Sequence, residues 1–198
     1  MKKILALALA LTMLLGVLSA LAEGDGTEYV FEAEYTELEG LEGLGVSGSP
    51  TGLGLVAENA KASNGYFVGN LGTASPITFV IVSDTDASAT LKLVVGSNIL
   101  GSCAWNPTTL KILVNGEAIE YNEFTTDNGD DPMDQNNFKT KKIGEINLVA
   151  GENTIVIVAG ENTYRSNLPS APSIDAIKLT TTAALEMVES EASHDELD

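Results

Sequence analysis

The sequence contains only one cysteine and one histidine in 198 residues. With a single thiol, Cys103, no disulfide can form within the chain, and this residue either stays a buried thiol, the commoner fate, or pairs with another molecule. The only histidine, His194, lies close to the C-terminus. The body of the protein therefore lacks the residues for a Ser-His-Asp triad, a Cys-His pair or a histidine-rich zinc site. Its stability must come from packing, to which a bound metal ion can add.

Positive charge is also scarce in this chain. It has 10 Lys and Arg residues against 28 Asp and Glu residues, which gives a formal net charge of −18 at pH 7. Phosphate backbones and anionic membrane surfaces repel such a protein, so we expect neither as a partner. No Lys or Arg occurs between Lys3 and Lys61. Divalent cations and neutral hydrated polymers are the partners that suit an acidic surface.

Only one long apolar run is present, at residues 4–18. It follows Lys2 and Lys3 and ends before Ala-Leu-Ala at residues 20–22, which is a small-residue cleavage site. The run is too short for a stable membrane span. The sequence therefore predicts a signal peptide at residues 1–22 and a secreted mature chain, whose formal charge falls from −18 to −20 with the loss of the two lysines.

What the sequence does contain is a series of short runs rich in Val, Ile and Thr. They lie at residues 55–58, 77–82, 89–95, 110–114, 142–149, 153–158 and 174–180. Asn115-Gly116 is a typical hairpin turn, because both positions tolerate positive φ. Since no helical pattern is evident, the runs predict an all-β fold, an antiparallel two-sheet β-sandwich over residues 23–182. The acidic remainder, residues 183–198, is expected to be a disordered tail or a frayed helix.

Residues 28–37, EYVFEAEYTE, carry two carboxylates close together. In an extended strand the aromatic side chains face one side, where they can seal a core, and Glu32 and Glu34 face the other. Two carboxylates about 7 Å apart along a strand repel each other unless a cation or water separates them. Because no Lys or Arg lies nearby in the sequence, a hard cation such as calcium is one candidate neutraliser. The alternative is that both carboxylates are solvated strand residues.

Five motifs follow one another along the chain: FEAEY, SNGYFVGNLG, LKILVNG, INLVAGENTIVIV and SIDAIKL. Together they resemble carbohydrate-binding module families 6 and 35, which are galactose-binding-like jelly rolls, over residues 28–180. The resemblance implies a structural calcium ion held by Glu32, Glu34 and Asp175, with carbonyl groups of the glycine-rich segment 39–54 completing the shell. Such an ion would join the first and last strands. The alternative for Asp175, which interrupts an otherwise apolar run, is an exposed strand residue.

The resemblance also implies a sugar site in the loops at one end of the sandwich. Sugar rings present C–H faces that stack on aromatic rings. Tyr66 matches an aromatic position of the family in SNGYFVG, and Asn64 precedes it. The family often carries a tryptophan in a loop where this chain has only Phe138. The family also has an asparagine near the last strand, and here only Asn167 lies near that position. Trp105, in another loop, is either a relocated platform or a cap on the edge of the core.

A further group of acidic residues lies in the stretch 125–137, TTDNGDDPMDQNN. The residues are Asp127, Asp130, Asp131 and Asp134. Their oxygens are numerous enough for a second, weaker calcium site. The spacing is not that of an EF-hand loop, because the glycine comes too early and no glutamate closes the loop. The alternative is an acidic, solvated loop.

These features predict a secreted, non-catalytic carbohydrate-binding module that recognises polysaccharide or oligosaccharide with the loops of a calcium-stabilised jelly roll. We expect no enzyme, because a lone sugar-binding jelly roll lacks the paired carboxylates across a cleft that glycoside hydrolysis needs. We expect an extracellular monomer without a nucleic-acid partner and without membrane insertion. The alternative function is an extracellular surface or adhesion module whose loops bind a protein partner.

Overall fold

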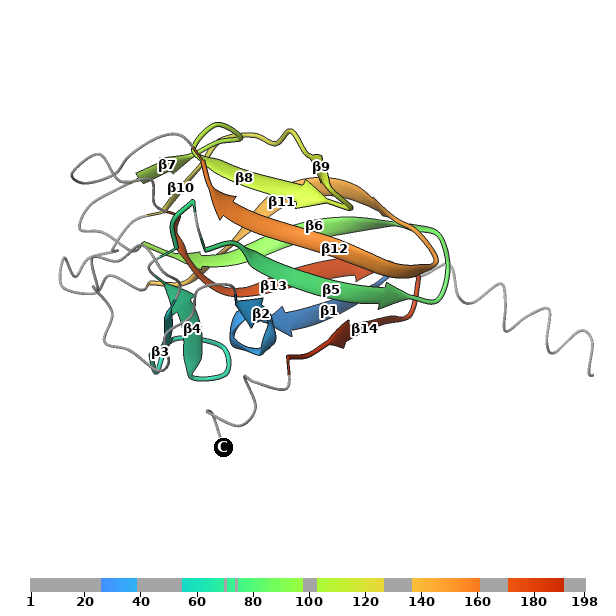
Figure 1. Ribbon diagram of the computed structural model, residues 1–198, viewed down its shortest axis with the longest axis horizontal. Coiled ribbons are helices and arrows are strands. Elements are labelled where there is room, and N and C mark those ends of the chain that lie inside the picture. The colour runs from blue at the N-terminus through green and yellow to red at the C-terminus, as the bar shows by residue number, and fades with distance from the viewer. Residues whose placement is uncertain are drawn as a thin grey trace, which may run out of the picture.

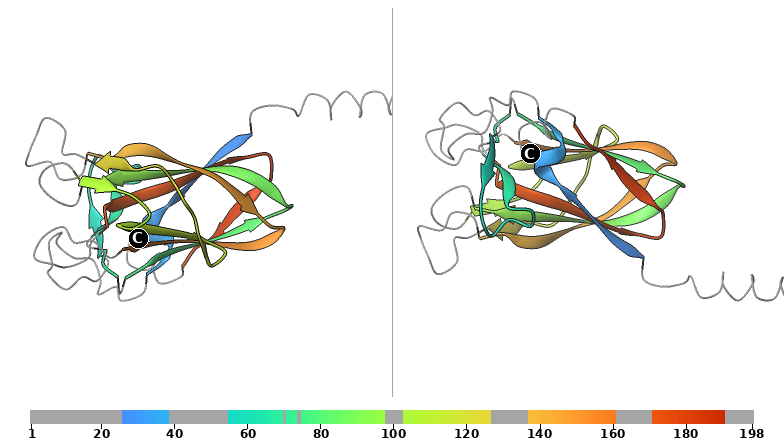
Figure 2. Two further views of the ribbon diagram at one scale, coloured as in Figure 1. Left: turned by 90° about the horizontal axis from the view of Figure 1, so that it is seen from above. Right: turned by 90° about the horizontal axis from the view of Figure 1, so that it is seen from below.

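Two large antiparallel sheets packed face to face make up most of the described part of the protein, as the sequence predicts. The computed structural model describes residues 26–38, 55–69, 71–73, 75–97, 103–126, 137–160 and 171–190. Within these residues, two six-stranded sheets and one two-stranded sheet account for all the strands (Figure 1). Figure 2 shows the two large sheets as facing layers. The all-β sandwich is therefore confirmed.

The first sheet has the strand order β11-β6-β13-β4-β3, and β1 pairs with β13 outside this order. Its strands are β11 (Lys139–Leu148), β6 (Ala87–Gly96), β13 (Ser173–Thr181), β4 (Tyr66–Gly69), β3 (Leu55–Glu58) and β1 (Thr27–Glu32). The second sheet has the order β14-β5-β12-β8-β9, with β2 beside β5. Its strands are β14 (Leu185–Val188), β5 (Ile77–Ser83), β12 (Gly151–Ala159), β8 (Leu110–Val114), β9 (Glu117–Ala118) and β2 (Glu37–Leu38). A small sheet pairs β7 (Cys103–Trp105) with β10 (Phe124–Thr126).

The core lies between the two large sheets because their strands alternate buried and more exposed side chains. In β12, for example, Ile155 and Ile157 are fully buried, whereas the residues between and after them are only partly buried. The hairpin turn predicted at Asn115-Gly116 is confirmed, with φ values of 53° and 85° at the two residues. Cys103 is buried and forms no disulfide.

The short strands of the sandwich gather at one of its ends (Figure 1). In Figure 1 the short strands β3, β4, β7 and β10 gather at the left end of the molecule, away from the turns that join the long strands at the right. Among the described residues, no helix is long and apolar enough to cross a bilayer. The predicted signal peptide, residues 1–22, lies outside the described residues.

The first part of the C-terminal segment is a strand, whereas a disordered tail or a frayed helix was expected for residues 183–198. Leu185–Val188 forms β14, which pairs with β5 at the edge of the second sheet. Leu185 and Met187 are partly buried against the core, whereas Glu186 and Val188 are exposed. An alternation of partly buried and exposed residues is typical of a strand. It is not evident from the composition of the segment, which is dominated by carboxylates. The folded domain therefore extends beyond residue 182, and residues 191–198 lie outside the described part of the chain.

Shortening the C-terminus tests this boundary. A chain that ends after Ala184 loses β14, and we expect its free energy of unfolding to fall by about 1 to 2 kcal/mol, because two partly buried apolar side chains are lost. A chain that ends after Ser190 keeps β14 and should be as stable as the full chain in urea-induced unfolding. Equal stability of the two shortened chains would show that β14 contributes nothing.

Candidate functional site

β13 changes its neighbouring strand at Asp175. On one side of this point Glu32, the last residue of β1, lies opposite Ala176; on the other, Ile174 lies opposite Val68 of β4. The register of β13 against β6 also shifts between Ile174 and Ala176, so Asp175 is the extra residue of a β-bulge. A bulge bends a strand and redirects the side chain of its extra residue. Asp175 is thereby turned into a site where only 1% of its surface is exposed.

The chain does not continue as a strand after Glu32, and this corrects the expected extended segment 28–37. Residues Ala33–Tyr35 form a 3-10 turn, η1, where the chain leaves the first sheet for the second. Thr36 closes the turn, since its backbone N–H and its hydroxyl both donate to the carbonyl of Ala33, at 3.2 and 2.7 Å. The turn places Glu34 in a fully buried position. Glu32 and Glu34 therefore do not lie side by side on the open face of a strand.

Two residues of the loop between β3 and β4 hold the three carboxylates. The backbone N–H of Ser63 donates to both oxygens of Asp175, at 3.0 and 3.2 Å, and its hydroxyl donates to Oε2 of Glu32 at 2.6 Å. The side-chain amide of Asn64 donates to Oε1 of Glu34 at 3.1 Å. Glu32, Glu34 and Asp175 thus surround the dipeptide Ser63-Asn64, and we call them the carboxylate cluster. Ser63 and Asn64 thereby link the end of β1, the turn η1 and β13 through hydrogen bonds.

Burial raises the pKa of every member of the carboxylate cluster. For Glu34 burial raises the pKa from 4.5 to about 7, and the negative charges of Glu32 and Asp175 act in the same direction. For Glu32 and Asp175 burial also raises the pKa, and the hydrogen bonds from Ser63 partly oppose it. The raised pKa values indicate that no positive charge near the three carboxylates fully offsets the cost of burying them.

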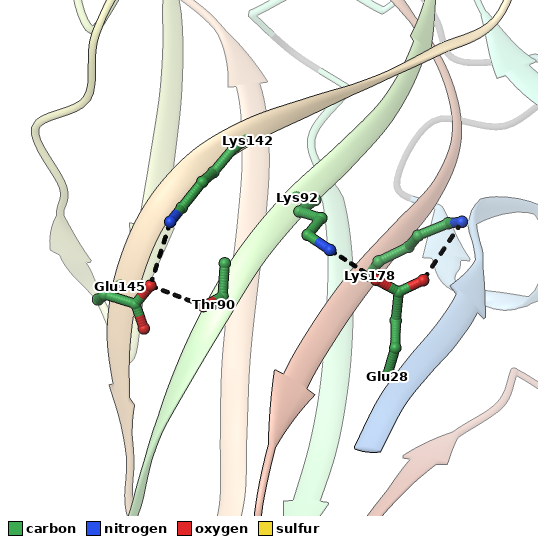
Figure 3. A network of polar contacts seen from close by, with 6 residues as sticks. All are labelled: Glu28, Thr90, Lys92, Lys142, Glu145 and Lys178. Carbon is green, nitrogen blue, oxygen red and sulfur yellow. Dashed lines mark hydrogen bonds and ion pairs between the residues drawn. The ribbon is translucent and has the colours of Figure 1, made fainter. Parts of the chain in front are cut away.

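The nearest lysine is engaged elsewhere. Lys178 lowers the pKa of Glu32 and of Asp175, but its ammonium group lies 3.6 Å from Glu28. Lys92 also pairs with Glu28, at 2.6 Å. Figure 3 shows both lysines directed at Glu28 on the outer face of the first sheet, next to the separate group of Lys142, Glu145 and Thr90. None of the ion pairs found among the described residues includes a member of the carboxylate cluster.

Three carboxylates are chemically suitable ligands for a hard cation, but the described residues do not arrange them as a ligand shell. Oε2 of Glu34 is buried and, among the described residues, has no hydrogen-bond partner, which leaves a desolvated carboxyl oxygen unsatisfied. Calcium prefers carboxylate oxygens of this kind. In the described part of the chain, no three His, Cys, Asp or Glu side chains lie close enough together to hold a metal ion as they stand. Ser63 bridges Glu32 and Asp175, so a cation would have to draw the carboxylates together around this residue.

Tyr66, the predicted platform, lies at the start of β4 beside a surface hollow of about 430 Å³. The other residues that line the hollow are Glu58, Asn59, Ala60 and Gly65. Tyr66 is partly buried and packs against the core, which fixes the position of its ring. An aromatic ring with an amide and a carboxylate nearby is a suitable environment for a polar ring-shaped ligand.

The other predicted ligand residues have different roles. The amide of Asn64 is already bound to Glu34 and to the hydroxyl of Tyr35, the latter at 2.8 Å. Phe138 packs against a small apolar cluster, where its ring centroid lies 5.4 Å from that of Phe67. Asn167 lies outside the described residues, as does the candidate second calcium site formed by Asp127, Asp130, Asp131 and Asp134.

Trp105 is a core residue and not a sugar platform. Its side chain is fully buried within β7, and its indole N–H donates to the hydroxyl of Thr126 on β10 at 2.8 Å. A ring with no exposed surface has no face to offer to a saccharide. Of the two alternatives for Trp105, the structure therefore excludes the relocated platform.

Ser63 is the residue of the site that the sequence did not reveal. It has no charge and no ring, and its importance depends on the bulge at Asp175 and on the turn at Glu34, neither of which is evident in the sequence. Its only distinguishing feature is that it precedes Asn64 in the motif SNGYFVG. Asn59, which lines the hollow, was also not singled out in the sequence, because it too has neither a charge nor a ring.

Solved structures with a similar fold include isolated carbohydrate-binding modules. A family 35 carbohydrate-binding module from Clostridium thermocellum has a TM-score of 0.55 and 15% identity, covering 77% of this chain and 97% of that chain. The CBM35 from Paenibacillus barcinonensis has a TM-score of 0.52 and 23% identity, covering 78% and 98%. The chain has the fold of a family 35 carbohydrate-binding module. No family model matches the sequence, and no curated protein matches it either.

The same module fold also occurs within larger proteins. The GH26-CBM35 β-(1,4)-mannanase from Podospora anserina has a TM-score of 0.54 and 24% identity over 80% of this chain, but this chain spans only 28% of the length of that enzyme. The two isolated modules, in contrast, are matched over nearly their whole length. The likeness to the enzyme therefore covers a minor part of that protein.

Proposed function

We propose that this protein is an extracellular, non-catalytic module that binds polysaccharide or oligosaccharide in the hollow beside Tyr66. The observation that carries the proposal is the hollow itself, which has a fixed aromatic ring at its wall and lies at the loop-rich end of a family 35 module fold. The near-complete match to isolated modules supports a binding function without catalysis.

The hollow offers the groups that saccharide recognition needs. The ring of Tyr66 can stack on the C–H face of a sugar, while the side chains of Glu58 and Asn59 can replace the water that sugar hydroxyls lose on binding. Glu58 is exposed and Asn59 is partly buried, so both are accessible. A carboxylate in the wall, in a protein of net charge −18, favours a neutral glycan over a uronate.

Calcium is the proposed stabiliser of the site. Glu32, Glu34 and Asp175 would hold it, and the unsatisfied Oε2 of Glu34 supports this assignment. When bound, the ion would supply the positive charge that three buried carboxylates lack. The residues themselves fix the end of β1, the bulge of β13 and the loop that contains Ser63 relative to one another.

Retention on immobilised glycans tests the proposal. We expect the protein to be retained on at least one neutral polysaccharide in a panel that contains β-1,4-mannan and a uronate polymer, and we expect Tyr66→Ala to abolish this retention. The reason is that the substitution removes the only ring among the described residues that line the hollow. Affinity electrophoresis with each polysaccharide measures the effect.

Tyr29→Ala is the matched control, because Tyr29 is also a partly buried tyrosine that packs against the core, on β1. It should lose a similar amount of stability and keep the retention. Loss of retention in both variants would mean that reduced stability, and not the hollow, explains the result. If the unaltered protein is retained on no polysaccharide, the proposed function fails, and a protein partner becomes the leading hypothesis.

A further inference from the structure

The wall of the hollow combines an aromatic ring with a negative charge. Glu58 is the only charged side chain among the described residues that line the hollow, and it lies directly opposite Tyr66 in the register of β3 and β4. We infer that the hollow selects a glycan that carries free, protonated amino groups, and that Glu58 determines this specificity. The inference rests on the proposed function, because it names the class of saccharide that the same hollow binds.

Glu58 and Tyr66 form a cross-strand pair whose side chains lie close together. The backbone N–H of Asn59 donates to the carbonyl of Gly65 at 2.8 Å, so these two residues are a hydrogen-bonded pair. Hydrogen-bonded and non-hydrogen-bonded pairs alternate along an antiparallel ladder, and side chains approach each other more closely in the second kind. Glu58 and Tyr66 are the next pair along the ladder, and we expect their Cβ atoms to be about 5 Å apart. A ligand group that contacts the ring can therefore also reach the carboxylate.

The charge of Glu58 is not neutralised by the described part of the protein. No hydrogen bond and no ion pair found among the described residues reaches its exposed carboxylate. Glu28, on the outer face of the same sheet, pairs in contrast with both Lys92 and Lys178 (Figure 3). Lys61, the nearest cation along the chain, is not among the described residues that line the hollow. The carboxylate of Glu58 is thus available to a cationic group of a ligand.

A protonated amine gains binding energy at both members of the pair. The face of an aromatic ring attracts a cation, and a carboxylate accepts charge-assisted hydrogen bonds from it. The formal net charge of −18 also raises the concentration of cations near the surface. A hydroxyl or an N-acetyl group at the same position of the sugar carries no charge and lacks these contributions. The preference for a neutral glycan over a uronate therefore extends one step further, to an amine-bearing glycan over a neutral one.

Asn59 supplies a hydrogen-bond donor beside this pair. Its side-chain oxygen accepts the backbone N–H of Lys61 at 2.8 Å, which orients the amide and leaves its N–H groups for a ligand. An amide N–H can donate to a hydroxyl oxygen of a sugar, but it cannot accept a hydrogen bond from an ammonium group. Asn59 therefore suits any saccharide, and the discrimination in favour of an amine falls to Glu58.

A set of β-1,4-linked trisaccharides that differ only at C2 tests the inference. The trimers of glucosamine, N-acetylglucosamine and glucose carry an ammonium, an acetamide and a hydroxyl group there. Nuclear magnetic resonance titration at about pH 6, where amines are protonated and ordinary carboxyl groups are ionised, follows binding through the amides of Gly65 and Tyr66. We expect the glucosamine trimer to bind at least about fivefold more tightly than either neutral trimer, because a surface ion pair and a cation–π contact each add modestly.

Glu58→Gln should reduce this preference to less than about twofold while the neutral trimers still bind. Glu152→Gln is the matched control, because it removes the same charge from an exposed position of β12 outside the hollow, and it should keep the full preference. An equal loss of preference in both variants would show that the overall charge of the protein is responsible, and would overturn the role of Glu58.

The remaining outcomes separate this inference from the proposed function. Equal binding of the trimers, an unchanged preference in Glu58→Gln, or binding of none of them by a protein that a polysaccharide retains overturns the amine specificity and leaves saccharide binding intact. A trimer of lysine that binds the hollow as tightly as the glucosamine trimer would overturn it in favour of a basic protein partner. Failure of every trimer and of every polysaccharide in the retention assay overturns both.

Discussion

Replacing Trp105 by alanine is expected to lower the free energy of unfolding by about 3 to 5 kcal/mol, a typical cost for deleting a fully buried tryptophan. The side chain has no exposed surface, and its loss leaves a large cavity between the small sheet and the core. It also leaves the hydroxyl of Thr126, buried on β10, without the indole N–H that it accepts. Urea-induced unfolding, followed by far-ultraviolet circular dichroism, measures the change.

The same variant separates the two roles that the sequence left open for this residue. Since Trp105 does not reach the surface, the folded fraction of Trp105→Ala should keep its retention on polysaccharide. Trp105→Phe, which keeps an aromatic ring in the core, should lose much less stability. A loss of retention together with a stability change below about 1 kcal/mol would show that the ring binds ligand after all.

The protein without calcium is expected to lose stability as the pH rises from 4.5 to 7. Glu34 has a pKa of about 7 when folded and 4.5 ordinarily, so the folded state binds its proton more tightly than the unfolded state does. The tighter proton binding at Glu34 therefore adds its full amount to the free energy of unfolding below pH 4.5, and this amount is lost as the pH rises through 7. The loss is on the order of 2 to 3 kcal/mol. Chemical unfolding in EDTA at a series of pH values measures it.

Two comparisons isolate the cause of this pH dependence. Glu34→Gln keeps the shape of the side chain without the charge, so its stability should change much less over the same pH range. Calcium at 100 times its dissociation constant should restore about 2.7 kcal/mol to the unaltered protein at pH 7. If the variant and the unaltered protein show the same dependence on pH, the buried carboxylate at Glu34 is not its source.

The fold was predictable because it depends on patterns that repeat along the chain. Runs such as 77–82 and 153–158 alternate or persist in apolar character over enough residues to define strands, and Asn-Gly at 115–116 defines a turn through local backbone preference. These features act locally, so they can be recognised without knowledge of the neighbours. The acidic composition of residues 183–198, in contrast, concealed the short alternating run of β14.

The candidate site was predictable in its members but not in its geometry. Glu32 and Glu34 stand out as two carboxylates close together in a segment without Lys or Arg, and the family resemblance adds Asp175, which interrupts an apolar run. Their arrangement depends on η1, where the chain changes sheets, and on a bulge in β13, and both are consequences of tertiary packing. Ser63 acquires its role only through these two features. Trp105 was ambiguous because a single aromatic residue in a loop suits a core and a binding surface equally well.

The measurement that tests the central claim most directly is a calorimetric titration of the metal-free protein with calcium chloride. We predict one bound calcium ion, with a dissociation constant on the order of 10⁻³ M or tighter, as in extracellular modules. Glu34→Gln should weaken the binding at least about tenfold, which corresponds to about 1.4 kcal/mol. Glu186→Gln, at an exposed position of β14, should leave it unchanged. Equal affinity in the unaltered protein and in Glu34→Gln, or no binding at all, would contradict the account.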